Sequence, residues 1–253
     1  MFSYNNYKEI IQIIKKSGKY SSFHEVKSSS LEEKRREEFI LMRHDVEFSV
    51  ERAFKLAKLE NDNDFCSHYF FQLTNNAYNF LSRKNIDMIN EMINFGHKVG
   101  LHFHLNDLTE IEDIKKQIVK EIQIMSEMLN FKIDSFSIHR PTVGVLRANI
   151  KLPGIINAYE DRFFSFTENV KENPPEILYI ADSKHRWNYG LEPDKATLMN
   201  NKRIQILTHP YSWTPEGYDN LNNFRTLIAE KQDILIETLD AETKHFKEIR
   251  DAL

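Results

Sequence analysis

The chain has 253 residues, 41% of them hydrophobic and 12% aromatic, and its 34 basic and 38 acidic side chains leave a formal net charge of −4. This length suits one α/β barrel domain, and the apolar content is enough for a large core, which excludes a disordered chain. Acidic and basic residues are interspersed, without a basic block that could neutralise a run of phosphates. Nucleic acid is therefore not an expected partner.

The sequence also carries information about the compartment. The single Cys66 cannot form an internal disulfide, and it lies in an apolar run that suits a packed, reduced thiol. Residues 1–8 lack the basic start and apolar stretch of a signal peptide, and no window approaches 18 apolar residues. We therefore expect a cytoplasmic protein without a membrane span.

The chain opens with a predicted helix over residues 7–16, where isoleucines recur at helical spacing before Gly18. We expect one domain that spans residues 1–253, with residues 1–38 as its N-terminal helical extension.

From residue 39 onward, short buried runs alternate with longer amphipathic segments. Helices are predicted at 50–60, 77–94, 110–130 and 241–253. Strands are predicted at 39–42, 65–72, 98–103, 135–138, 155–158, 177–180, 204–207 and 234–236. Buried strands separated by helices indicate mainly parallel pairing. The expected fold class is therefore α/β, a single distorted (β/α) barrel of about seven parallel strands.

Polar and ionisable side chains follow five of these strands, at residues 43–47, 102–104, 139–141, 182–183 and 209–210. In a parallel barrel the loops after the strands converge on one pocket at the carboxyl edge. One buried histidine is usually a hydrogen-bonded core residue, but five such strand ends together predict a functional site.

The residue types at these ends favour a metal. His102 and His104 project onto one face of an extended chain, and imidazoles with a carboxylate such as Asp45 form the ligand set preferred by zinc and other divalent transition metals. Three protein ligands leave positions open for water and substrate. Because such a metal activates water and polarises a carbonyl, hydrolysis of an amide or ester is the expected chemistry.

Over residues 39–213 the motifs resemble those of the polysaccharide deacetylase family, also called the NodB-homology family or carbohydrate esterase family four. Their order and spacing agree with the family, and the variant that begins Arg-His-Asp is associated with gene clusters for surface polysaccharides. The five similar segments are Leu41-Met42-Arg43-His44-Asp45, Gly96-His97-Lys98-Val99-Gly100-Leu101-His102, His139-Arg140-Pro141, Ala181-Asp182-Ser183 with Trp187, and Ile206-Leu207-Thr208-His209-Pro210.

The resemblance implies a metal-dependent carbohydrate deacetylase, most simply a zinc enzyme. It implies that Asp45 and His102 bind the metal and that His209 is the general acid that protonates the departing amine. It further implies that Arg140 and Asp182 are orienting groups and that Leu207 and Trp187 line an acyl pocket. Tyr211 and Trp213, which follow His209 directly, are candidates for stacking on a sugar ring.

The sequence departs from the family pattern at two places. The family's second ligand histidine falls at Asn106 here, so either His104 or the Asn106 carbonyl oxygen completes the site. In the first motif, one alignment makes Asp45 a ligand with Glu47 or His44 as the candidate base. The shifted alignment makes Asp45 the base and Glu47 the ligand. We prefer the first, with Asp45, His102 and His104 as the metal ligands.

The expected function is removal of an acyl group, N-acetyl above all, from a sugar or saccharide intermediate. Two alternatives remain open. One is a carbohydrate-binding protein on the same fold without turnover, and the other is a metal-dependent amidohydrolase that acts on a small non-sugar amide.

Overall fold

A computed structural model describes residues 1–28, 38–165 and 175–250 of the chain. Seven strands form one sheet in which every neighbouring pair is parallel, in the order β5-β4-β3-β2-β1-β7-β6. The predicted α/β class and strand number are confirmed. The strands are β1 (Phe39–Val46), β2 (His68–Phe71), β3 (Lys98–His104), β4 (Ser135–His139), β5 (Ile156–Asn157), β6 (Leu178–Ala181) and β7 (Arg203–Thr208).

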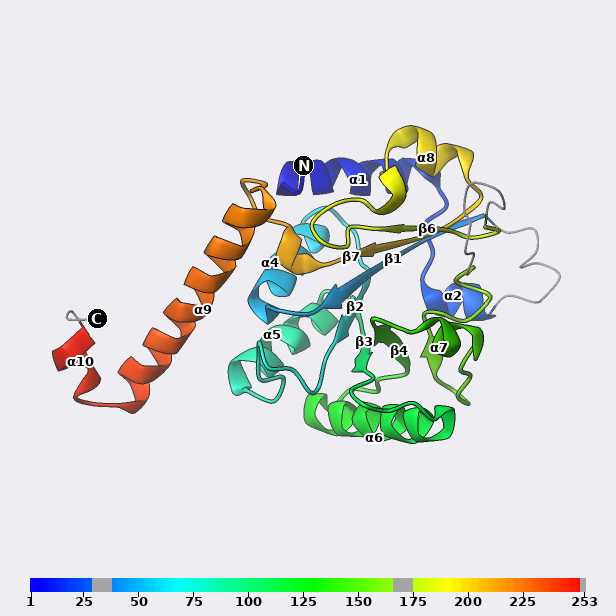
Figure 1. Ribbon diagram of the computed structural model, residues 1–253. Helices are drawn as coiled ribbons and strands as arrows, with labels where there is room; N and C mark the ends of the chain where they lie inside the picture. The colour runs from blue at the N-terminus through cyan, green and yellow to red at the C-terminus, as the bar shows by residue number, and fades with distance from the viewer. Residues whose placement is uncertain (29–37, 166–174, 251–253) are drawn as a thin grey trace.

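Helices cover the outside of this sheet, and α9 extends away from the body at the left of Figure 1. Helix α4 connects β1 to β2, α5 connects β2 to β3 and α6 connects β3 to β4, as the β/α alternation requires. The α-helices are α1 (Tyr4–Ser17), α2 (Phe23–Ser28), α4 (Val50–Asn61), α5 (Arg83–Asn94), α6 (Ile111–Leu129), α7 (Val143–Arg147), α8 (Lys195–Asn200), α9 (Asn220–Glu242) and α10 (Phe246–Ile249), with short 3₁₀ turns η1 (Asn188–Gly190) and η2 (Pro210–Ser212).

The sheet is curled, so that its two edge strands face one another. Tyr159, just after β5, and Tyr179, in β6, lie with ring centroids 6.5 Å apart although their strands are at opposite edges. Gln205 on β7, the neighbour of β6, also reaches the segment after β5. Its side-chain amide donates hydrogen bonds to the carbonyl oxygens of Ala158 and Phe163, both at 2.9 Å. The result is a half-barrel with a polar interior above a buried apolar base.

Alternation along the strands decides which side chains enter this interior. On β3, Val99, Leu101 and Phe103 belong to the core that α6 covers, so the intervening Gly100, His102 and His104 lie on the inner face. Gly100 has no room for a side chain, because a Cβ there would lie 2.6 Å from the Phe70 ring and from Ser135 Oγ. The inner face is therefore already packed below His102.

One predicted strand is wrong, and one predicted helix begins later than expected. The strand expected at 234–236 lies inside α9, whose first turn is capped by the Asp219 side chain accepting from the backbone of Asn222. Three apolar residues in a row are too short a pattern to separate strand from helix, and Leu235 is 59% exposed. The helix expected from residue 77 begins at Arg83, because Ser82 caps it by accepting from the backbone of Asn85.

At the chain ends, the predicted N-terminal helix is present and the predicted C-terminal helix is shorter than expected. The helix predicted over residues 241–253 is reduced to α10 (Phe246–Ile249), and residues 251–253 lie outside the described part. The predicted opening helix is present as α1, and α2 follows it within the N-terminal extension, of which residues 29–37 are not described.

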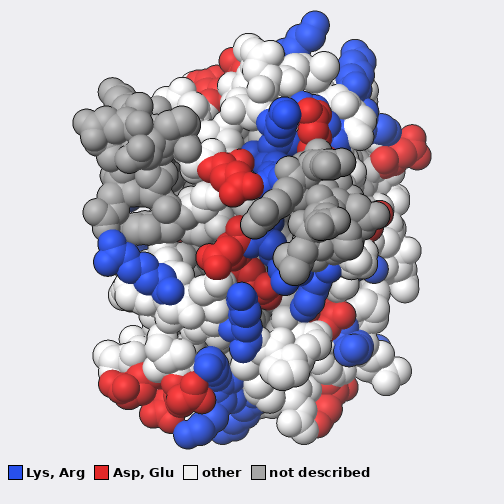
Figure 2. All heavy atoms as spheres, turned by 90° about the vertical axis from the view of Figure 1, so that its right-hand side faces the viewer, with Lys and Arg blue, Asp and Glu red and all other residues white. Residues whose placement is uncertain are grey.

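The described surface carries charges of both signs. Figure 2 shows the face at which β1 begins, where acidic and basic side chains lie next to one another. Within the described residues, no helix is both long enough and apolar enough to cross a membrane.

Candidate metal and acid–base site

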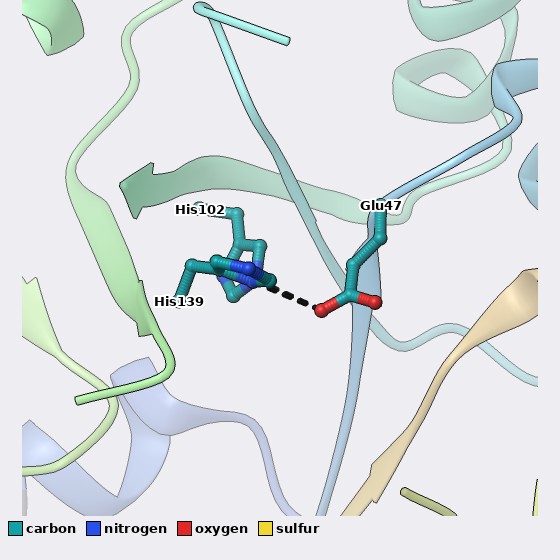
Figure 3. Close-up of side chains that lie close together, drawn as sticks. All are labelled: Glu47, His102 and His139. Atoms are coloured by element: carbon teal, nitrogen blue, oxygen red, sulfur yellow. Dashed lines mark hydrogen bonds and ion pairs between the residues drawn. The ribbon is translucent and has the colours of Figure 1, made fainter. Parts of the chain in front are cut away.

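Three side chains from three strand ends converge at the carboxyl edge of the sheet. Glu47 follows β1, His102 lies on β3 and His139 ends β4, and their ligand atoms all lie within 4.8 Å of one another. Figure 3 shows both imidazoles directed toward the Glu47 carboxylate. Glu47 Oε1 is 2.9 Å from His139 Nδ1 and 3.9 Å from His102 Nε2, and the two ring nitrogens are 3.2 Å apart.

The hydrogen bonds behind His102 fix its tautomer. The Ser137 hydroxyl donates to Asp45 Oδ1 at 3.1 Å, and the same Ser137 oxygen lies 2.7 Å from His102 Nδ1. Because the hydroxyl proton is used toward Asp45, the Ser137 oxygen must accept from a protonated Nδ1. In the neutral ring this leaves the lone pair of His102 Nε2 facing Glu47 and His139.

This arrangement fits a divalent cation. Ligand atoms on a sphere of about 2.1 Å radius, the usual distance for zinc to nitrogen or oxygen, lie at most about 4.2 Å apart. The three separations of 2.9, 3.2 and 3.9 Å all fall within that limit. Two imidazoles and a carboxylate are also a donor set that zinc accepts, and the Ser137 contact is the kind of outer support that ligand histidines have.

Asp45 lies beside this cluster and is tied to a buried arginine. Arg43 Nη2 donates to Asp45 Oδ2 at 3.3 Å and to the Tyr159 hydroxyl at 2.6 Å. The guanidinium also lies over the Tyr159 ring, 4.4 Å from its centroid. Arg43 is fully buried, and its Nε and Nη1 have no hydrogen-bond partner among the described residues. Burial acts to lower the pKa of Arg43, but Asp45 and the nearby phenols outweigh it and raise it.

Across the same edge, His209 forms a buried pair with Asp182. His209 Nδ1 lies 2.6 Å from Asp182 Oδ1, and the carboxylate also accepts from the His209 backbone and from Trp213 Nε1 at 2.9 Å. The other ring nitrogen, Nε2, is 3.8 Å from Glu47 Oε1. Burial lowers the pKa of His209, but the Asp182 charge and hydrogen bond outweigh it and raise the pKa to about 9.

We therefore expect His209 of the metal-free protein to remain an imidazolium well above neutral pH. Since its folded pKa lies above the unfolded value of about 6.5, the pair stabilises the fold fully below that value, and the contribution is lost as the pH rises through about 9. Histidine NMR titration measures this directly. Asp182→Asn should shift the His209 pKa downward, and a titration midpoint that does not change would contradict the assignment.

A cavity of about 1010 Å³ opens above these groups. One wall is aromatic: the Tyr211 ring contacts Phe48 at 4.8 Å and Phe224 at 5.8 Å between centroids. The remaining lining residues that matter for the chemistry are Asp45, Glu47, His102, His139, Arg140, Tyr159, Tyr179, Lys184, Leu207 and His209.

Several residues predicted from the sequence come together here and others do not. Asp45, Glu47, His102, Asp182 and His209 lie within this group of contacts. Leu207 and Tyr211 line the cavity, whereas Trp187 and Trp213 pack against each other and Phe2 in the core.

His104 lies outside the three-residue cluster. Its Nδ1 accepts the backbone N–H of Asn106 at 2.9 Å, and its ring stacks on His139 with centroids 5.0 Å apart. Asn106 is exposed and bonds back to His104. Glu47, the ligand of the shifted alignment, lies beside His139 and on the Nε2 side of His102, whereas Asp45 Oδ2 is 3.6 Å from His102 Nδ1.

His44 lies on the opposite face of β1 from Asp45. Its Nδ1 is 2.6 Å from Thr208 Oγ1 and its Nε2 is 3.1 Å from the buried Glu60 carboxylate. Arg140 is exposed on the cavity lining, and among the described residues it is Arg43 that contacts Asp45.

Three participants have no role assigned from the sequence: Arg43 and His139, which stand in the quoted motifs, and Ser137. The alternation of β4 contained the signal for two of them, since Phe136 and Ile138 face the outer core and leave Ser137 and His139 inward. For Arg43 the signal was its position two residues before Asp45 on the same strand face.

Fold and site together define a parallel α/β half-barrel protein with a histidine- and carboxylate-lined cavity at the carboxyl edge of its strands. No protein-family model matches the sequence, and the comparison with curated proteins finds no similar chain.

Among solved structures, the chain is similar to a CE4 family pseudoenzyme from Bacillus anthracis at 13% identity, covering 78% of this chain and 61% of that one, with a TM-score of 0.43. A chitin deacetylase from the fungal pathogen Colletotrichum lindemuthianum is similar at 18% identity, 76% and 81% coverage and a TM-score of 0.43. A Streptococcus mutans CE4 esterase is similar at 14% identity, covering 85% of this chain and 89% of that one, with a TM-score of 0.49. The chain spans less than two thirds of the pseudoenzyme's length.

Proposed function

We propose that the protein is a metal-dependent hydrolase that removes an acyl group, N-acetyl above all, from a sugar. The observation that carries this proposal is the placement of a metal-type donor set and an acid–base pair at one cavity. Glu47 Oε1 is 2.9 Å from His139 Nδ1 on one side and 3.8 Å from His209 Nε2 on the other.

In this proposal Glu47, His102 and His139 hold a divalent cation, zinc being the natural occupant of such a set. A cation bound there polarises the acyl carbonyl and lowers the pKa of a water. Among the described residues, Asp45 is the remaining carboxylate on the cavity lining. Held by Ser137 and Arg43, it accepts the proton of the attacking water. His209, oriented by Asp182, donates a proton to the departing nitrogen.

The cavity supports a sugar rather than a small amide alone. Its volume of about 1010 Å³ is far larger than an acetamide group needs, and typical small-molecule sites measure about 300–1,000 Å³. The rings of Phe48, Tyr211 and Phe224 provide an apolar face against which a sugar ring can pack.

The first test is metal content. We expect about one divalent metal ion per purified chain, and we expect His102→Ala and His139→Ala each to lose most of it, because two remaining ligands hold the ion poorly. Elemental analysis of the purified variants measures the loss. His104→Ala is the matched control, because its ring contacts His139 but its Nδ1 is already bonded to Asn106. Loss of metal in the control with retention in His139→Ala would contradict the proposed ligand set.

The second test is acetate release from N-acetylated sugars by the metal-loaded protein. Release that disappears in Glu47→Gln supports the hydrolase. A protein that binds metal and sugars but releases no acetate would instead support the binding-protein alternative.

A further inference from the structure

Two cations on the cavity lining have no counter-charge among the described residues. Arg140 follows β4 and Lys184 follows β6, and both are exposed. Neither makes a hydrogen bond or an ion pair with any described residue. By contrast, the two carboxylates that the described residues place on the lining are already engaged, Asp45 with Arg43 and Glu47 with the histidines.

Both residues have an unusual backbone conformation. Arg140 has a φ of 46° and Lys184 a φ of 60°, in the left-handed region that residues other than glycine rarely adopt. Such conformations persist only where the surrounding structure imposes them, and they concentrate at binding sites. The two residues belong to loops at opposite sides of the curled sheet, so they lie on the lining of one cavity although their strands are far apart in the sheet order.

The distribution of charge then determines what the cavity accepts. Its buried end holds the carboxylates and histidines of the proposed reaction, whereas its exposed rim holds two cations that pair with none of the described residues. A guanidinium and an ammonium together recognise the oxygens of a phosphate or carboxylate, the guanidinium through two parallel hydrogen bonds. The volume of about 1010 Å³ leaves room for such a group beyond one acylated sugar ring.

We propose that the substrate carries an anionic group, a phosphate or a carboxylate, which Arg140 and Lys184 bind at the rim of the cavity. The choice of an N-acylated sugar as its neutral part rests on the proposed function, whereas the anion site itself does not.

Calorimetric titration of the metal-loaded protein tests this binding without turnover. The probes are methyl N-acetylglucosaminide as the neutral sugar, N-acetylglucosamine 1-phosphate and N-acetylglucosaminuronate. At least one anionic probe should bind about tenfold or more tightly than the neutral one, as expected for a charge-assisted contact. Raising the salt concentration should weaken only the anionic probes. The tighter of the two anionic probes identifies phosphate or carboxylate as the group.

The variants separate this site from the reaction. Lys184→Gln and Arg140→Gln should each weaken the anionic probe about tenfold while the metal content stays at the wild-type level. Lys120→Gln, on the outer helix α6, is the matched control and should leave the affinity unchanged. Equal affinity for neutral and anionic probes, or variants that bind the anionic probe as tightly as the wild type does, would overturn the inference. Loss of anion binding in both variants, without acetate release from any sugar by the wild type, would support the anion site and contradict the deacetylase.

Discussion

Replacing His209 by alanine is expected to slow the hydrolysis of an N-acetylated sugar by about 10²–10⁴, the usual contribution of a positioned general acid. An amine leaves poorly until it is protonated, and His209 is the imidazole that Asp182 orients beside Glu47. The metal should remain bound, because the proposed ligands are Glu47, His102 and His139. Turnover and metal content are measured on the same preparation.

An activated ester provides the control for this prediction. Its leaving group needs no proton, so 4-nitrophenyl acetate should be hydrolysed by His209→Ala with a smaller loss than the amide. His209→Gln keeps a polar side chain beside the buried Asp182. It should show the same pattern of losses if His209→Ala is impaired by the missing acid and not by misfolding. Equal losses on both substrates, or loss of the metal, would mean that His209 acts as a ligand or a packing residue.

Arg43→Met is expected to lower the free energy of unfolding by about 3 kcal/mol. Removing one partner of a buried ion pair costs about 3–5 kcal/mol, because the other charge is left buried without compensation. Asp45 is 2% exposed, and among the described residues it would keep the Ser137 hydrogen bond and the His102 ring at 3.6 Å, but no arginine. The expected loss is at the lower end of this energy range, because the substitution also removes two buried guanidinium nitrogens that have no partner among the described residues. Urea denaturation at neutral pH measures the difference.

Two further variants test the cause of this loss. In Arg43→Met/Asp45→Asn neither charge remains, so much of the stability should return. A double variant as unstable as the single one would show that packing against Tyr159, rather than charge, is responsible. Arg83→Met removes an exposed pair with Asp87 and should change stability by about 0.5 kcal/mol or less.

The largest error in the sequence-based fold shows where local patterns fail. The local pattern of Ile234, Leu235 and Ile236 indicates a buried strand, yet these residues lie in the second half of α9, with Leu235 exposed. A run of three apolar residues is compatible with both the helical and the strand periodicity. The packing of the whole segment decides between helix and strand. Longer segments such as α6 and β3 were predicted almost to the residue, because their pattern repeats several times.

The sequence by itself determined the α/β architecture and the strand ends that bear the chemistry, because both follow from hydrophobic periodicity and from the convergence of loops in a parallel sheet. Only the tertiary structure decided which of those side chains meet. His104 and His139 look equivalent in sequence, but the parallel register places them side by side, and the turn at Asn106 engages His104 Nδ1 while His139 turns toward Glu47. Likewise, Arg43 rather than Arg140 contacts Asp45, because alternate residues of one strand share a face, whereas the loop after β4 carries Arg140 to the cavity rim.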